Sequence, residues 1–164
     1  MRKDLGKKLA FLPLPVLMIG TYDAEGHANV MNAAWGGVYD SGEIFISLSK
    51  HKTTDNLELK KAFTVSFATK ETTKISDYFG VASGNHEDKI AKSGVHVIKS
   101  NHVDAPIIEE YPLTLECKVK SFSNGELIGE IENVSVDEKY IDENGNVDVE
   151  KMNIITFDML GNHY

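Results

Sequence analysis

A compact cluster of positive charge in this chain stands directly before two hydroxyl side chains. Lys50, His51 and Lys52 precede Thr53 and Thr54, close to a predicted helix start, in a protein whose net charge is −8. Free N–H groups and the dipole at a helix N-terminus favour an anion, and ammonium and hydroxyl groups are natural phosphate donors. The pattern therefore indicates a site for a phosphate monoester. The alternative interpretation is a capped surface helix with solvated lysines.

Small and polar residues precede this cluster by one predicted strand. Residues 32–34 (Asn-Ala-Ala) offer small side chains and backbone amides, while Ser47 and Ser49 lie on the polar face of the run EIFISLS. A flat heteroaromatic ring edged with nitrogen and oxygen acceptors needs such a wall, because small residues let the backbone approach. Trp35 is placed to cover the ring or line its pocket. The alternative is that the two alanines pack inside a barrel and Trp35 anchors the core.

Other catalytic and metal-binding patterns are missing or incomplete. The six histidines show no H-x-x-x-H, HExxH or cysteine-paired spacing, so no metal site is predicted. The run DENGNVDVEKMN begins like a calcium loop but has Val147 where glycine is needed and Asn153 where glutamate is needed. Cys117 lies on the apolar face of an alternating segment, where a cysteine is usually inert. There is no G-x-S-x-G, G-x-G-x-x-G or P-loop motif, so hydrolase and nucleotide-fold interpretations have no support.

The composition is that of an ordinary globular domain. The 164 residues are enough for one core, and residues 1–164 are interpreted as a single domain. No stretch approaches the roughly 18 apolar residues of a membrane span. With 17 Lys and Arg against 25 Asp and Glu, nucleic acid and anionic membranes are poor partners. The basic, apolar start lacks a cleavage site and the single cysteine cannot form an internal disulfide, so the cytoplasm is the expected compartment.

Period-two patterns predict a mainly β protein. Strands are expected in residues 15–23, 27–35, 43–49, 63–69, 112–119, 126–136 and 154–157. The clearest hairpin joins 112–119 to 126–136 through Asn124-Gly125, with a bulge near Gly129. Residues 99–110 are interpreted as a surface connection.

Two or three short helices are expected between these strands: one in residues 53–62, and short helices or helical turns in 71–83 and 86–94. A capping box of Asp55 and Glu58, or a cap at Thr53 or Thr54, is expected to begin the first helix. Since regular βαβ alternation is absent, about seven strands favour a closed or nearly closed antiparallel barrel.

Six segments in order resemble the flavin reductase-like family of FMN-binding split barrels, and most of all its flavoredoxin-type members. They are PVLMIGTYDAEGHANVMNAAWGG, ISLSKHKTTDNL, AFTVSFAT, SGNHEDK, DAPIIEEYPLTLECKV and LIGEIENV, which together cover about Pro15 to Phe157. The resemblance implies a Greek-key split β-barrel that forms a homodimer and holds FMN near the dimer interface. By position, the resemblance implies a ring-contacting segment formed by Asn32, Ala33, Ala34 and Trp35, and a second wall formed by Ser47, Leu48 and Ser49. It implies a phosphate-side segment formed by Lys52, Thr53, Thr54 and Asn56. It also implies that Lys89 is a further basic residue near the flavin.

The sequence departs from the family pattern in two places. Many relatives have a basic residue after the glycine of the SG pair, where this chain has Asn85. Relatives also often continue past the last strand, whereas this sequence ends at GNHY, which leaves Tyr164 as the remnant of a C-terminal lid.

The function implied is an FMN-dependent oxidoreductase that receives a hydride from NADH or NADPH and passes electrons to an acceptor. No catalytic acid or base is expected, because the flavin carries the redox chemistry. Two alternatives stay open: a flavoredoxin-like carrier that exchanges electrons with a protein partner without NAD(P)H, and a barrel that binds another phosphorylated ligand or none.

Overall fold

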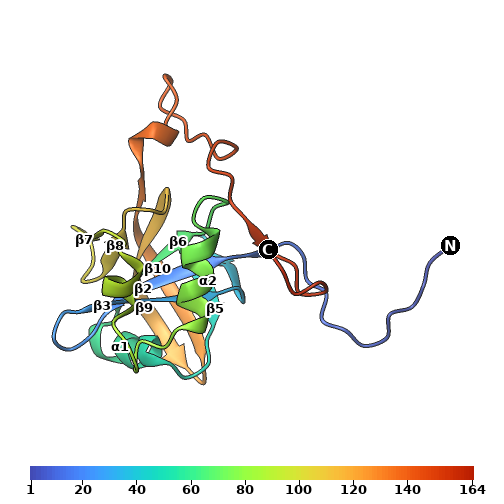
Figure 1. Cartoon of the computed structure of the whole chain (residues 1–164), viewed down its shortest axis with the longest axis horizontal. Helices are drawn as coiled ribbons and strands as arrows, with labels where there is room; N and C mark the ends of the chain where they lie inside the picture. Colours follow the sequence, from blue (N-terminus) through green and yellow to red (C-terminus); the bar gives the residue numbers. More distant parts are fainter.

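The computed structural model describes all residues, 1–164, and is built on a curled antiparallel sheet of seven strands (Figure 1). The strand order is β3-β2-β6-β9-β10-β5-β4. Their bounds are Leu17–Tyr22 for β2, Ala28–Ala33 for β3, Gly36–Asp40 for β4, Glu43–Ser47 for β5, Ala62–Phe67 for β6, Leu113–Ser123 for β9 and Glu126–Val136 for β10.

Two short strand pairs and three α-helices complete the chain. The pairs are β1 (Leu14–Pro15) with β11 (Thr156–Phe157), and β7 (Val97–Lys99) with β8 (Pro106–Ile108). The helices are α1 (Lys52–Lys60), α2 (Thr73–Val81) and α3 (Lys89–Ser93), with a single 3-10 turn, η1, at Glu138–Tyr140. None of the helices combines the length and the apolar character needed to cross a membrane. The prediction of a mainly β fold with two or three short helices is confirmed.

The β9–β10 hairpin follows the sequence prediction closely. Asn124 and Gly125 have φ angles of 53° and 81°, the left-handed pair that a tight turn needs. The expected bulge is present, because the register shifts between Ile128 and Gly129. At Gly129 a Cβ would stand less than 3.0 Å from the Phe63 ring, so only glycine lets this bulge lie against the core.

Three strands were not anticipated. β4 contains two glycines and an aspartate, residues with weak β-propensity, and forms because it pairs with β5 from Gly36↔Ile46 to Asp40↔Glu43. β8 lies within residues 99–110, which the sequence indicated to be a surface connection, and β7 ends at the first residue of that range. Both are three residues long, too short for a period-two pattern to show.

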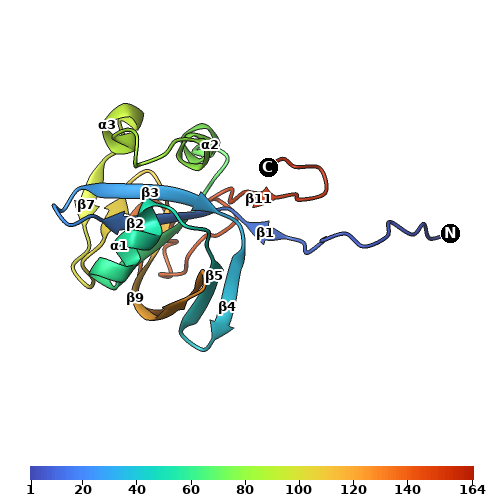
Figure 2. The same ribbon diagram turned by 90° about the horizontal axis from the view of Figure 1, so that it is seen from below.

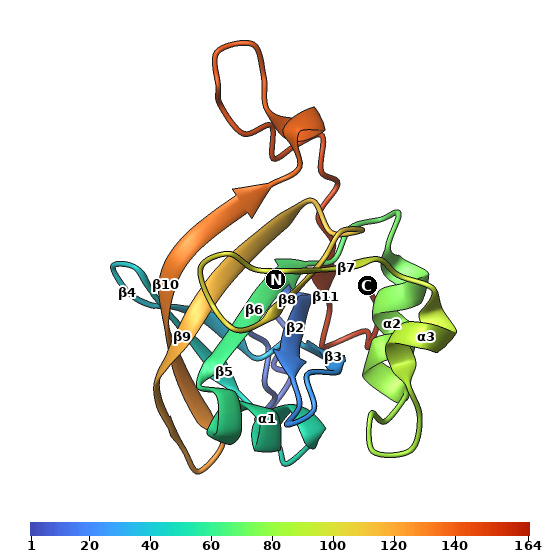
Figure 3. The same cartoon turned by 90° about the vertical axis from the view of Figure 1, so that its left-hand side faces the viewer.

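The core has two main parts on opposite faces of the curled sheet. Inside the barrel, Ile19, Ile46, Phe63 and the α1 residue Leu57 are fully buried, so α1 closes one end of the barrel (Figure 3). On the outer face, Phe79 of α2 packs in a second cluster, and α2 and α3 lie beside β3 (Figure 2).

Cys117 belongs to the inner part of the core. Its side chain is fully buried, and burial first, then the charge of Glu116, raises the pKa of the thiol to about 12. A thiol this far from ionising is unreactive, in agreement with the interpretation of Cys117 as an inert hydrophobe.

Candidate functional site

The N-terminus of α1 presents backbone donors that have no acceptor within the chain. Its cap is His51, whose N–H donates to the Thr54 hydroxyl at 3.0 Å, and that hydroxyl donates back to the His51 carbonyl at 2.7 Å. The helix therefore begins earlier than predicted, and the expected Asp55–Glu58 box is wrong because Thr54 already closes the cap. The N–H groups of Lys52 and Thr53 make no hydrogen bond, which is the arrangement that binds anions at helix N-termini.

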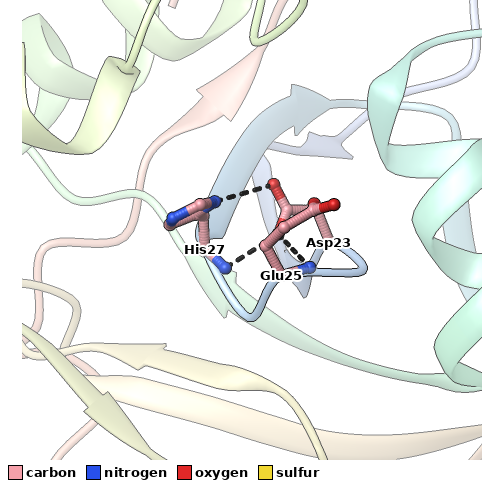
Figure 4. A group of neighbouring side chains, drawn as sticks. All are labelled: Asp23, Glu25 and His27. Atoms are coloured by element: carbon pink, nitrogen blue, oxygen red, sulfur yellow. Dashed lines mark hydrogen bonds and ion pairs between the residues drawn. The ribbon is translucent and has the colours of Figure 1, made fainter.

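Lys52 is held in place by a carboxylate on the β2–β3 turn. Its Nζ lies 3.1 Å from Oδ2 of Asp23, while Oδ1 of Asp23 accepts the N–H groups of Glu25 at 3.1 Å and His27 at 2.8 Å. Figure 4 shows this turn, with the His27 ring 3.4 Å from Oδ2. Burial raises the pKa of Asp23, but the hydrogen bonds from the His27 backbone and the Lys52 ammonium outweigh it, so the net pKa is lowered.

The grouping of Asp23, Glu25 and His27 has the ligand types of a metal site, with atoms within 4.8 Å of one another. Both oxygens of Asp23, however, already accept hydrogen bonds from the turn and from Lys52. The cluster is therefore explained as an anchored turn that orients Lys52.

A second lysine lines the same cavity as Lys52. This cavity of about 200 Å³ is bounded by β3, the α1 N-terminus and the loop before α3, and the carboxylates Glu87 and Asp88 line it as well. Lys89 is buried, and its Nζ donates to the carbonyls of Phe79 at 3.2 Å and Ala82 at 3.3 Å without any carboxylate partner. Burial is the main cause that lowers the pKa of Lys89 to about 8; the charge of Glu87 opposes this shift and that of Lys52 adds to it. The Lys89 ammonium has no ion-pair partner of its own, which leaves it able to contact an anionic group.

The two predicted ring walls are neighbours in the structure. The Ser47 N–H donates to the Trp35 carbonyl at 2.7 Å, and β4 pairs with β5 directly beyond them. The N–H groups of Ala34 and Trp35 and the hydroxyls of Ser47 and Ser49 make no hydrogen bond within the chain. These free donors suit a ring edged with acceptors.

Trp35 does not anchor the core. Its side chain is 54% exposed and lines an apolar cavity of about 320 Å³ together with Phe11, Val38 and Phe45. The interpretation of Trp35 as a ring cover or pocket residue is thus compatible with its position, whereas the core interpretation is wrong.

Some proposed site residues face the interior. Thr53 accepts a hydrogen bond from the Asn29 amide at 2.9 Å, and Asn56 donates to Thr21 at 3.0 Å, so both buried side chains support the framework. The Leu48 side chain lies in the inner core and its N–H donates to the Gly125 carbonyl, so Leu48 supports the framework as well.

The Asn32 side chain contacts α2 and the C-terminal residue. Its amide donates to the Ser76 carbonyl at 3.1 Å and to the Tyr164 hydroxyl at 3.3 Å. The last residue of the chain therefore contacts the segment predicted to touch the ring, in the place where a C-terminal lid was expected.

No single cavity brings together all of the proposed residues. Trp35 and Ser47 line the apolar cavity, Lys52 and Lys89 line the two-lysine cavity, and a third cavity of about 370 Å³ is lined by Leu48, Ser49 and Thr54 among others. Each of the three cavities takes at least one lining residue from positions 47–54.

Sequence reasoning missed three supporting residues. Asp23 orients Lys52, and Asn29 donates a hydrogen bond to Thr53. Gly84 allows the loop before α3 to approach Asn29, because a Cβ at position 84 would stand less than 3.0 Å from the Asn29 side chain. Their partners are more than twenty residues away in the sequence, so no local sequence pattern predicts these contacts.

Comparisons with known proteins identify the family of this chain. The family model described as "Flavin reductase like domain" matches residues 9–150 of this chain. The chain belongs to the flavin reductase-like family. A comparison with the curated proteins finds no match.

Two flavoredoxins of known structure are similar to this chain over its whole length. The chain is similar to the flavoredoxin of Desulfovibrio vulgaris (Miyazaki F), with 34% identity, a TM-score of 0.95 and coverage of 100% of this chain and 92% of that one. The flavoredoxin of Methanosarcina acetivorans matches with 27% identity, a TM-score of 0.86 and coverage of 100% and 90%.

An FMN-binding protein of Thermus thermophilus shares the fold at 19% identity, with a TM-score of 0.72 and coverage of 90% and 84%. The family resemblance and the split-barrel fold are thus confirmed, and the expectation of FMN as cofactor is supported.

Proposed function

We propose that this protein binds FMN and acts as an oxidoreductase that takes electrons from NADH or NADPH and passes them to an acceptor. The observation that carries the proposal is the α1 N-terminus, where the N–H groups of Lys52 and Thr53 make no hydrogen bond and the Lys52 side chain lines a cavity together with Lys89, Glu87 and Asp88. Backbone donors and two ammonium groups fit a phosphate monoester. Membership in the flavin reductase-like family supports a flavin as the rest of the ligand.

The ring edge has a donor set of its own. The N–H groups of Ala34 and Trp35 and the hydroxyls of Ser47 and Ser49 would hold the ring, because they are free and lie on adjacent segments. Bound FMN would supply the redox chemistry by taking up a hydride and giving up electrons. The chain's own residues then bind and orient the cofactor and limit solvent access, and no acid or base from the protein is required.

A second function is favoured by the comparisons. The two most extensive likenesses described above are to proteins named flavoredoxins, each covering the whole chain. This supports an FMN electron carrier that exchanges electrons with a protein partner and does not use NAD(P)H. The net charge of −8 would suit a basic partner surface.

We further propose that two copies of the chain associate through the apolar cavity at Trp35. Val38 on the edge strand β4 is 86% exposed and Phe11 on the N-terminal arm is 68% exposed, and both line this cavity. The N-terminal arm extends away from the barrel (Figure 2), and its apolar side chains, Leu5 and Leu9 among them, are exposed and would cover a second copy. Burying such a patch against another copy removes apolar surface from water.

The test begins with titration of the purified protein by FMN, followed by its visible spectrum. NADH or NADPH is then added anaerobically to the loaded protein. Bleaching of the flavin within seconds supports the oxidoreductase, whereas a flavin reduced only by dithionite or a partner protein supports the carrier. Absence of any spectral change on FMN addition rejects both.

A further inference from the structure

The tip of the β9–β10 hairpin lies directly against the loop that joins β5 to α1. The Leu48 N–H donates to the Gly125 carbonyl at 2.7 Å. The Leu48 carbonyl also faces Gly125 so closely that a Cβ at position 125 would stand less than 3.0 Å from its oxygen. The hairpin tip therefore contacts both backbone polar groups of Leu48.

Leu48 is consequently fixed from two sides. Its side chain is buried in the inner core, and its backbone is held by the hairpin tip. The residues on either side of it, Ser47 and Ser49, carry unpaired hydroxyls, and the N–H groups of Ser49 and Lys50 are free. The position of these donors depends on where the Leu48 backbone is held.

We propose that Gly125 is a positioning residue for the ring side of the flavin site. It holds the backbone of Leu48 and thereby sets the direction of the donors at Ser47 and Ser49. Glycine is needed at position 125 for two separate reasons, which are its φ of 81° and the absence of a Cβ against Leu48. The inference rests on the proposed binding of FMN and deepens it.

Two glycine variants separate these reasons. Gly125→Ala introduces both the unfavourable φ and the collision, whereas Gly145→Ala introduces an alanine at a φ of 83° where nothing lies within 4 Å. We expect Gly125→Ala to weaken binding of FMN and of riboflavin by the same factor, about tenfold or more, because the contact acts on the ring and not on the phosphate. Gly145→Ala should stay within about twofold of the parent protein.

Gly129→Ala controls for loss of stability in the same hairpin. Its Cβ would collide with the Phe63 ring in the core, away from the β5–α1 loop. At saturating FMN, the visible circular dichroism of the flavin should change in Gly125→Ala and stay unchanged in Gly129→Ala. Affinity losses that merely follow the loss of unfolding free energy in both variants would overturn the inference.

Amide hydrogen exchange on the unmodified protein gives a test that does not depend on a variant folding. The Leu48 amide should be protected before ligand is added, while the Ser49 and Lys50 amides should become protected on addition of riboflavin. Unchanged exchange at both residues, or a Gly125→Ala affinity within twofold, refutes the positioning role and leaves the proposed function standing. A parent protein that binds neither flavin refutes the proposed function itself.

Discussion

The side-chain amide of Asn29 donates a hydrogen bond to the hydroxyl of Thr53 across 2.9 Å, and both residues are buried. The contact ties β3, which leads into the ring wall, to the second residue of α1, which begins the phosphate side. The two halves of the candidate site are thus joined by one bond between residues 24 positions apart.

This bond predicts a measurable coupling. Asn29→Ala leaves the Thr53 hydroxyl without its partner and should lower the free energy of unfolding by about 1–3 kcal/mol. A double-mutant cycle with Thr53→Ala, measured by urea denaturation, should give a coupling energy of about 0.5–1.5 kcal/mol. Additive losses would show that the bond contributes nothing.

Removal of the Lys52 ammonium should separate phosphate from ring recognition. We expect Lys52→Ala to weaken FMN binding about tenfold or more and riboflavin binding much less, because a charge-assisted contact to the phosphate is lost. Fluorescence titration with each flavin measures the two affinities.

Lys60→Ala at the other end of α1 is the matched control, since it removes an exposed ion pair with Asp104 that contributes little. Equal losses of FMN and riboflavin binding in Lys52→Ala would place the phosphate elsewhere. Thr54→Ala is less informative, because its hydroxyl caps the helix and its loss should cost about 1 kcal/mol of stability.

Lys89 predicts a pH dependence with a definite sign. Burial lowers its pKa to about 8 in the folded protein from the ordinary 10.5, so between these values the unfolded chain binds more protons than the folded one. The free energy of unfolding should therefore gain a positive contribution from this residue as pH rises from 8 toward 10.5.

The contribution is isolated by comparison with Lys89→Met, which keeps the apolar stem of the side chain. Denaturation of both proteins between pH 7.5 and 10 should show a difference that grows in favour of the parent protein by on the order of 2 kcal/mol. Parallel curves would mean that Lys89 keeps its ordinary pKa in the fold.

The apolar surface at Val38 predicts the assembly state. Val38→Asp places a charge in the centre of the proposed contact and should shift the protein from dimer to monomer, as measured by light scattering coupled to size exclusion. Val149→Asp is the control, because Val149 is also exposed and lies outside this cavity. A parent protein that is monomeric at micromolar concentration would contradict the proposed dimer.

Local rules accounted for the best-predicted parts of the fold. The β9–β10 hairpin was predicted because alternation and the Asn124-Gly125 pair act over a few residues. The bulge at Gly129 was visible for the same reason, as a shift in the apolar face. β4 was missed because its residues have little strand preference of their own, and its pairing with β5 supplies the stabilisation.

Such local rules predicted only part of the candidate site. Lys52 could be linked to an anion because charge, hydroxyls and a helix start adjoin in the sequence. That Thr53 and Asn56 point inward depends on Asn29 and Thr21, which lie on other strands. The role of Asp23 likewise depends on β2, β3 and α1 meeting at one edge of the barrel.

The sequence by itself determined the class of the protein: a mainly β barrel with short helices, a phosphate-type cluster at residues 50–54 and the flavin reductase-like pattern. These features rest on periodicity, turn chemistry and the order of segments, which are properties of neighbouring residues. Only the tertiary structure decided which side chains support the site, which face it, and that Lys89 is a buried cation without a carboxylate partner. Burial and contacts between distant strands are set by how the whole sheet curls, and no local stretch of sequence carries that information.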